Sequence, residues 1–121
     1  MTQLERLRIR PDFLAAAKGE KKPMPGLVLQ ARDNANHNHI RYGLTASKKV
    51  GNAVARNRVR RRLRVAAEQI LPNAGRRGFD YVLIGRQATL FRSFRDLLKD
   101  LETALKRIHD APQGNISSNG D

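Results

Sequence analysis

The segment from residue 48 to residue 64, KKVGNAVARNRVRRRLR, most constrains what this chain can fold into. Eight of its seventeen residues are Lys or Arg, and none is acidic. Like charges that stack at i,i+4 on a helix repel each other, at a cost of about 0.2–0.5 kcal/mol per pair. The segment is therefore a solvated surface, a basic tail that does not fold, or a surface that a polyanion completes.

Apolar spacing within the segment argues against the unfolded tail. On a helix, five apolar residues fall within an arc of about 100° and form a core-facing stripe. These residues are Val59, Leu63, Ala66, Ala67 and Ile70. Asn57, Arg60, Arg61 and Arg64 lie on the opposite side. Asn52 is suited to the N-cap, and Pro72 is expected to end the helix. The pattern predicts an amphipathic helix with a strongly basic outer face.

The overall charge favours a nucleic-acid partner over simple solubility. The chain of 121 residues carries 24 Lys and Arg against 11 Asp and Glu, a formal charge of +13. Seventeen of these cations are Arg, whose planar fork matches phosphate oxygens. No acidic residue occurs between Asn34 and Ala67, which indicates one basic face.

The same composition excludes several classes of protein. The absence of Cys excludes disulfides and thiolate metal sites, and no apolar run approaches the ~20 residues that span a bilayer. No P-loop motif or signal-peptide core is present. We expect a cytoplasmic protein with a single domain at 1–110, including an extended arm at 1–10, and a flexible tail at 111–121.

Local patterns predict the remaining elements. We expect a short helix at 11–18, a loop around residues 21–25, and strands at 26–32 and 40–47 that form a hairpin. The apolar run at 79–86 is typical of a strand buried on both faces. Ser93 and Asp96 form a capping motif for a final amphipathic helix. The order is α-β-β-α-β-α, an α+β fold.

The basic segment, with RYGLT before it, resembles the signature of the bacterial ribonuclease P protein subunit. The core of the likeness is the R-N-R triplet at 56–58, followed by Arg60, Arg61 and Arg64. RLRIRPDF with Gly19 resembles the opening of that family, and DYVLIGR before an amphipathic helix resembles its close. The resemblance covers about residues 4 to 108.

This resemblance implies a fold and an activity. The fold is a two-layer sandwich like the second domain of ribosomal protein S5, with a left-handed β-α-β crossover through the R-N-R helix. The usual rule for such crossovers predicts the opposite hand. The family's protein binds a catalytic RNA and the 5′ leader of precursor tRNA. Mg²⁺ held mainly by the RNA carries out the hydrolysis, and the protein supplies no catalytic side chain. We expect a monomer in a 1:1 complex with the RNA.

The resemblance also implies two RNA-facing surfaces. The surface for the catalytic RNA comprises Lys48, Lys49, Arg56, Asn57, Arg58, Arg60, Arg61 and Arg64. The leader cleft, between the first helix and the sheet, comprises Phe13, Ala17, Gln30, Arg8 and Arg10, with Arg6 expected near its mouth. Relatives often carry aromatic residues at the positions of Ala17 and Gln30. The residues alone leave open whether Phe13 stacks on a base or belongs to the core.

Other readings carry less weight. His37-Asn38-His39 spells H-N-H, but adjacent residues cannot converge on one metal ion, so we expect a loop. Asp96 and Asp100 are expected on a solvated helix face beside Lys99. The alternative function is a structural RNA-binding protein of the same fold. A self-sufficient nuclease would need a convergent acid/base or nucleophilic set, which the sequence does not show.

Overall fold

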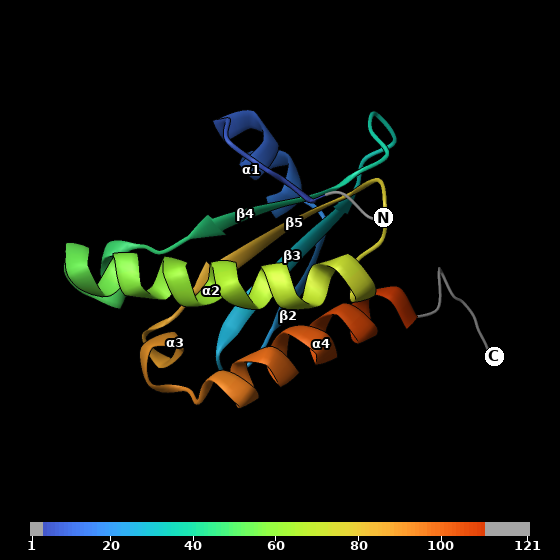
Figure 1. Ribbon diagram of the computed structural model, residues 1–121. Helices are drawn as coiled ribbons and strands as arrows, with labels where there is room; N and C mark the ends of the chain where they lie inside the picture. Colours follow the sequence, from blue (N-terminus) through green and yellow to red (C-terminus); the bar gives the residue numbers. More distant parts are fainter. Residues whose placement is uncertain (1–3, 111–121) are drawn as a thin grey trace.

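The computed structural model of the protein describes residues 4–110, so the tail predicted at 111–121 lies outside the described residues. The elements follow one another as shown in Figure 1. They are β1 (Leu4–Arg6), α1 (Arg10–Ala17), β2 (Glu20–Pro23), β3 (Leu27–Asp33), β4 (Ile40–Thr45), the 3₁₀ turn η1 (Lys48–Val50), α2 (Ala53–Ala74), β5 (Phe79–Gly85), α3 (Gln87–Phe91) and α4 (Phe94–Asp110). The predicted α-β-β-α-β-α order is present, with β1, β2 and α3 added.

The strands form one mixed sheet in the order β1-β4-β5-β3-β2. β1, β4 and β5 run parallel, whereas β3 is antiparallel to β5 and β2 is antiparallel to β3. β5 is central, and its residues from Asp80 to Leu83 are all buried. The prediction of a strand covered on both faces is confirmed.

The predicted hairpin between the strands at 26–32 and 40–47 is wrong. β5 lies between β3 and β4, so the two strands share no hydrogen bonds. The connecting loop instead crosses the start of β5. There the Asn34 N–H donates to the Gly78 carbonyl at 2.6 Å, and the Gly78 N–H donates to the His39 carbonyl at 2.8 Å. β5 is the most apolar strand, and it lies at the centre of the sheet because only there are both of its faces packed against other elements.

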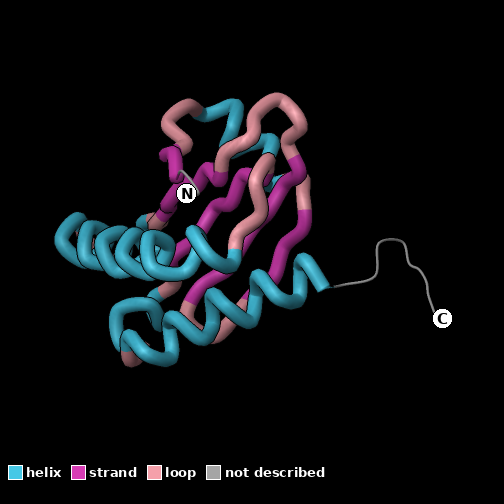
Figure 2. The backbone as a smooth tube through the Cα atoms, turned by 45° about the vertical axis from the view of Figure 1, so that its right-hand side comes forward, coloured by secondary structure: helices cyan, strands magenta, loops and turns pink. Residues whose placement is uncertain are grey.

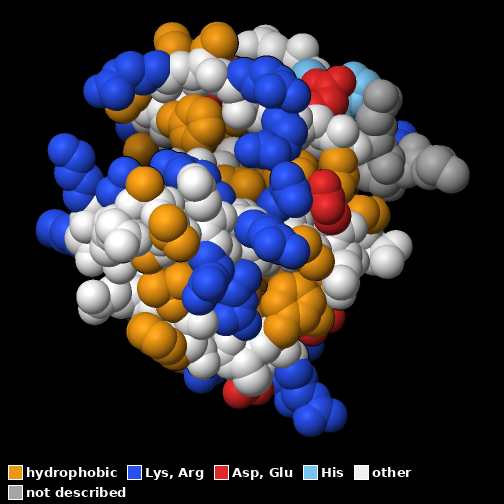
Figure 3. Space-filling model, turned by 60° about the vertical axis from the view of Figure 1, so that its left-hand side comes forward, with side chains coloured by type: hydrophobic (Ala, Val, Ile, Leu, Met, Phe, Trp, Pro, Cys, Tyr) orange, Lys and Arg blue, Asp and Glu red, His pale blue; other side chains and the backbone are white. Residues whose placement is uncertain are grey.

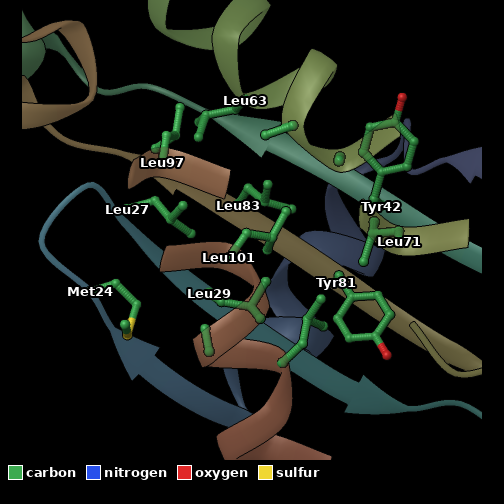
Figure 4. Close-up of a cluster of buried hydrophobic side chains, with 14 of the residues drawn as sticks. Met24, Leu27, Leu29, Tyr42, Leu63, Leu71, Tyr81, Leu83, Leu97 and Leu101 are labelled. Atoms are coloured by element: carbon green, nitrogen blue, oxygen red, sulfur yellow. The ribbon is translucent and has the colours of Figure 1, made fainter. Parts of the chain in front are cut away.

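α2 and α4 lie side by side on one face of the sheet, where the main core forms (Figure 2). In Figure 4, Leu63 and Leu71 of α2 and Leu101 of α4 point toward Leu83 and Tyr81 of β5. The predicted stripe of α2 is confirmed, since Val59, Leu63, Ala66 and Ala67 are fully buried and Ile70 packs against them. This burial orients the opposite, basic side of α2 outward.

The connection from β4 through α2 to β5 joins two adjacent parallel strands. With α2 in front of the sheet and both strands pointing left, as in Figure 1, β5 lies below β4, and the crossover is therefore left-handed. Asn52 caps α2 as predicted, because its Oδ1 accepts a hydrogen bond from the Ala55 N–H at 2.9 Å. Pro72 does not end the helix. α2 continues to Ala74, where the Gly75 N–H donates to the Leu71 carbonyl.

α1 lies on the other face of the sheet, where Ala16 packs with Leu7 and Val82 in a small second cluster. The helix predicted at 11–18 is confirmed with a shift of one residue. The loop predicted around 21–25 is wrong at its start, because residues 20–23 form the edge strand β2. Pro23 is tolerated at the end of that strand because an edge position needs no second hydrogen-bond partner.

Candidate nucleic-acid interface

The residues predicted to face the catalytic RNA form one surface, here called the α2 ridge. Seven of them are exposed and Arg56 is half-buried. The ridge consists of Lys48, Lys49, Arg56, Asn57, Arg58, Arg60, Arg61 and Arg64. Figure 3 shows the side of the molecule where α2 begins, with Lys and Arg side chains gathered across it and few acidic groups. The structure therefore brings the predicted residues together on one folded surface.

The turn before α2 holds the two lysines next to the start of the helix. The Ser47 Oγ accepts a hydrogen bond from the Lys49 N–H at 3.3 Å, and Gly51 then adopts a φ of 145° that side chains rarely tolerate. Arg56 Nη1 donates to the Gly51 carbonyl at 3.0 Å. Arg56 thus stabilises this turn as well as contributing charge.

The α2 ridge has a hollow on each flank, and Arg61 lines both. The hollow toward β1 and β4 has a volume of about 300 Å³ and is also lined by Arg6, Leu44, Asn57, Arg60 and Arg64. The hollow toward α4 has a volume of about 330 Å³ and is also lined by Arg58, Arg62, Val65 and Phe94. Neither lining contains an acidic side chain, so both flanks suit phosphate groups.

Arg6 belongs to the α2 ridge side, which corrects its predicted place at the leader cleft. Its Cζ lies 5.1 Å from the centre of the Tyr42 ring, a cation–π contact. Because β1 pairs with β4, Arg6 projects onto the same face of the sheet as Tyr42 and α2. Sequence patterns gave no sign of this pairing, since β1 is only three residues long.

Arg62 differs from its neighbours on α2 because its guanidinium is already bound within the protein. Its Nη1 donates to the Leu90 carbonyl at 2.8 Å and its Nη2 to the Arg92 carbonyl. These acceptors lie at the end of α3 and the turn before α4. Arg62 therefore attaches the α3–α4 turn to α2.

The predicted leader cleft lies on the face of the sheet that carries α1. There Gln30, Val82 and Gly43 form one row across β3, β5 and β4. The half-buried Phe13 ring lies on Gly43, so close that a Cβ at position 43 would be 2.5 Å from the ring. The structure thus places Phe13 and Gln30 on the same surface, with Gln30 only 9% exposed.

The other predicted cleft residues lie near Phe13 in the chain, in α1 and just before it. Ala17 follows Phe13 by one helical turn and is exposed, as are Arg8 and Arg10. The exposed apolar side chains Ile9 and Leu14 lie beside them in the chain. The surface therefore offers a ring, guanidinium groups and apolar area, and its binding role stays a prediction.

A buried ion-pair network fixes α1 next to this surface. The fully buried Asp80 accepts hydrogen bonds from Arg41, at 2.8 and 3.0 Å, and from Asn34, at 3.0 Å. Burial alone would raise the pKa of Asp80, but these hydrogen bonds and one from His37 hold that pKa below its ordinary value. Arg41 also contacts Asp12 of α1 at 3.3 Å. The network therefore joins β4, β5 and α1.

The histidines of the H-N-H sequence lie in a loop, as expected, and do not converge. His37 Nε2 is 2.8 Å from Asp80, whereas His39 Nε2 is 3.5 Å from Glu5. Within residues 4–110, no group of three or more His, Asp or Glu side chains could hold a metal ion. None of the helices described there has the length and apolar character needed to cross a membrane.

Asp100 corrects the expectation of a solvated carboxylate pair on the last helix. Its side chain is buried, and it accepts hydrogen bonds from the Gly26 N–H at 2.9 Å and from Arg92 at 2.9 and 3.0 Å. It is a structural group that joins α4 to the loop before β3. Asp96 is half-buried, and its N–H donates to the Ser93 Oγ, so the predicted Ser93 cap is confirmed.

Comparison with known proteins places this geometry in a family. The family model described as "Ribonuclease P" matches residues 1–109. The ribonuclease P protein component of Ruegeria pomeroyi is 53% identical over 106 residues, covering 85% of each chain. That of Paramagnetospirillum magneticum is 50% identical over 111 residues, covering 88% of this chain and 84% of the relative.

The fold agrees with that family. The structure of the ribonuclease P protein from Thermotoga maritima superposes with a TM-score of 0.72 at 31% identity, covering 86% of this chain and 97% of that one. The predicted fold class, including its R-N-R helix, is confirmed. This chain belongs to the ribonuclease P protein family.

Proposed function

We propose that this protein binds the catalytic RNA of ribonuclease P through the α2 ridge and the 5′ leader of precursor tRNA through the α1 face of the sheet. Family membership makes the chain the protein subunit of this endoribonuclease, which matures the 5′ ends of tRNA. Because the RNA subunit carries the catalysis, the protein contributes binding and electrostatics.

The observation that carries the proposal is the α2 ridge itself. The inner side of α2 is buried at Val59, Leu63, Ala66 and Ala67. The guanidinium groups of the α2 ridge therefore point outward from a folded helix. A helix with this charge gains stability when phosphates neutralise it. If about six phosphates are contacted, affinity should fall with roughly the fifth power of the salt concentration on a duplex.

The leader surface is proposed from the α1 face. Phe13 supplies a ring that can stack on any base, and Arg8 and Arg10 supply charge for the strand's phosphates. Gln30 is mostly covered, so it offers less area than an aromatic residue would. Binding that depends on stacking and charge suits a factor that processes many tRNA precursors.

The proposal assigns the Mg²⁺ ions of the reaction mainly to the RNA. The protein's part is to neutralise backbone phosphates, which lowers the Mg²⁺ concentration that the folded RNA requires. We further propose one protein per catalytic RNA, acting in the cytoplasm.

Reconstitution tests this function. The purified protein alone should leave precursor tRNA intact, and adding it to the matching catalytic RNA should accelerate cleavage at low Mg²⁺ more than at high Mg²⁺. Failure to stimulate at either Mg²⁺ concentration would overturn the proposal. A structural RNA-binding protein, the alternative function, would not give a stimulation that depends on the leader.

Two variants separate the two surfaces. Phe13→Ala should weaken binding of precursor tRNA by the holoenzyme and leave binding of mature tRNA unchanged. Arg61→Ala should weaken assembly with the catalytic RNA and leave the preference for precursor intact once the complex is saturated. An unchanged preference in Phe13→Ala would show that the leader surface is wrongly placed.

A further inference from the structure

The hollow on the α4 side of the α2 ridge combines arginines with an aromatic ring. It is lined by Arg58, Arg61, Arg62, Val65 and Phe94. Arg62 is committed to the carbonyls of Leu90 and Arg92. The side chains of Arg58 and Arg61 are exposed, and within the described residues their guanidinium groups donate no hydrogen bond to another side chain or to the backbone. The hollow therefore has two guanidinium groups available beside an apolar wall.

The ring in this hollow is held in place by its surroundings. Phe94 is the first residue of α4 and is half-buried, with part of its ring against the main core. The preceding Ser93 caps α4, and the hydrogen bonds from Arg62 attach the turn before it to α2. The position of Phe94 relative to the backbone of α2 is thus set before any ligand binds, which lowers the entropy cost of binding.

We propose that this hollow holds one unpaired nucleotide of the catalytic RNA, with its base against Phe94 and Val65 and its phosphate between Arg58 and Arg61. The inference rests on the proposed function, because it requires that the α2 ridge bind this RNA. A base within an A-form helix is stacked on its neighbours and cannot reach a side chain in this way. The nucleotide therefore comes from a loop, a bulge or a junction.

The chemistry of the hollow favours RNA over an acidic protein segment. Carboxylates would pair with Arg58 and Arg61 but would leave the ring face and Val65 without a matching group. A nucleotide carries a matching group for each: its base has a flat π-face for the ring and Val65, and its phosphate is an anion for the two arginines. Figure 3 shows apolar side chains lying directly among Lys and Arg side chains on this side of the molecule.

A fluorescence experiment tests stacking directly, because the chain contains no Trp. Phe94→Trp places a single indole in the hollow, and Phe91→Trp is the matched control, since Phe91 is 84% exposed and does not line the hollow. Catalytic RNA should quench the emission of Phe94→Trp at least twofold more than that of Phe91→Trp. Inorganic polyphosphate, which has the charge but no bases, should leave it nearly unchanged.

Two results of this experiment would overturn the proposal. One is an emission from Phe94→Trp that catalytic RNA leaves unchanged although the variant binds. The other is equal quenching by RNA and polyphosphate, which would show that charge alone alters the site.

Affinity measurements supply the second test. Phe94→Leu should weaken binding of the catalytic RNA by about tenfold, in the range that stacking on one base contributes, with an unchanged salt dependence. Phe94→Tyr, which keeps an aromatic ring, should bind the catalytic RNA with the affinity of the natural protein. Phe91→Leu should change that affinity less than twofold. Arg58→Ala should weaken binding and also lower the slope of log K against log salt by about one.

These outcomes distinguish the inference from the proposed function. If Phe94→Leu, folded by circular dichroism, binds as the natural protein does, the hollow holds no base even though the α2 ridge binds RNA. If the natural protein itself shows no salt-dependent affinity for the catalytic RNA, the proposed function is wrong, whatever the Phe94 variants show.

Discussion

The phenyl ring of Phe13 lies directly on the backbone of Gly43, which joins α1 to the parallel strand β4. A Cβ at residue 43 would come within 2.5 Å of the ring Cε1 and 2.6 Å of Cζ. Real side chains do not tolerate such contacts, so glycine at this position sets how deeply the ring sits. The position of the proposed leader contact therefore depends on a residue that has no side chain.

Gly43→Ala should displace the Phe13 ring and weaken binding of precursor tRNA. We expect a loss of up to about tenfold in precursor affinity, because stacking on one base contributes about 1–3 kcal/mol, with little change for mature tRNA. Equilibrium binding of both tRNAs to the reconstituted holoenzyme measures this. Gln87→Ala, at an exposed residue of α3 that lies away from the α1 face, is the control. Equal losses for the two tRNAs would contradict the prediction.

Arg61 and Arg62 should give opposite phenotypes although they are neighbours. Arg62→Ala should lower the free energy of unfolding by about 1.5–3 kcal/mol, because it leaves the carbonyls of Leu90 and Arg92 without their charged donor. Arg61→Ala should change that free energy by less than about 0.5 kcal/mol. Urea denaturation followed by circular dichroism measures both. Equal stabilities of the two variants would show that the bonds of Arg62 add nothing to the fold.

Asp80→Asn should be strongly destabilising. The carboxylate is fully buried and forms an ion pair with Arg41. Without its charge, the Arg41 guanidinium keeps Asp12 as its acidic partner. Breaking a buried ion pair in this way costs about 3–5 kcal/mol. Thermal unfolding measures the loss, with the half-buried Asp96→Asn as control. A melting temperature within a few degrees of the natural protein would contradict it.

The His109 contact predicts that the protein loses stability in mild acid. His109 Nε2 lies 2.6 Å from the Tyr81 hydroxyl, and the Phe79 ring packs edge-on at 4.7 Å. Burial lowers the pKa of His109 below 6.5, and the charge of Arg76 adds to this, although Asp110 opposes it. The unfolded chain therefore binds a proton first, so stability is complete above pH 6.5 and falls as the pH drops below it.

Measuring the free energy of unfolding between pH 7.5 and about 5 checks this prediction. His109→Gln should remove most of the slope, whereas His39→Gln, whose imidazole is 40% exposed, should keep it. A slope that persists in His109→Gln would show that another group is responsible.

The sequence alone determined the features that arise from local periodicity. The apolar stripe from Val59 to Ile70 makes α2 amphipathic, and burying that stripe leaves only one side for the R-N-R arginines. The apolar run of β5 likewise required a central strand. The resemblance to the family supplied the left-handed crossover, which the general preference for right-handed crossovers would not have given.

Only the tertiary structure decided which distant groups meet. β5 separates β3 from β4, β1 brings Arg6 to Tyr42, and Asp100 is buried against Gly26. Arg62 reaches backbone carbonyls 28 and 30 residues away, while Arg61 beside it faces solvent. The physical reason is that periodicity along the chain specifies which side of an element is buried, whereas a hydrogen bond or stacking contact depends on the position of the next element to within an ångström.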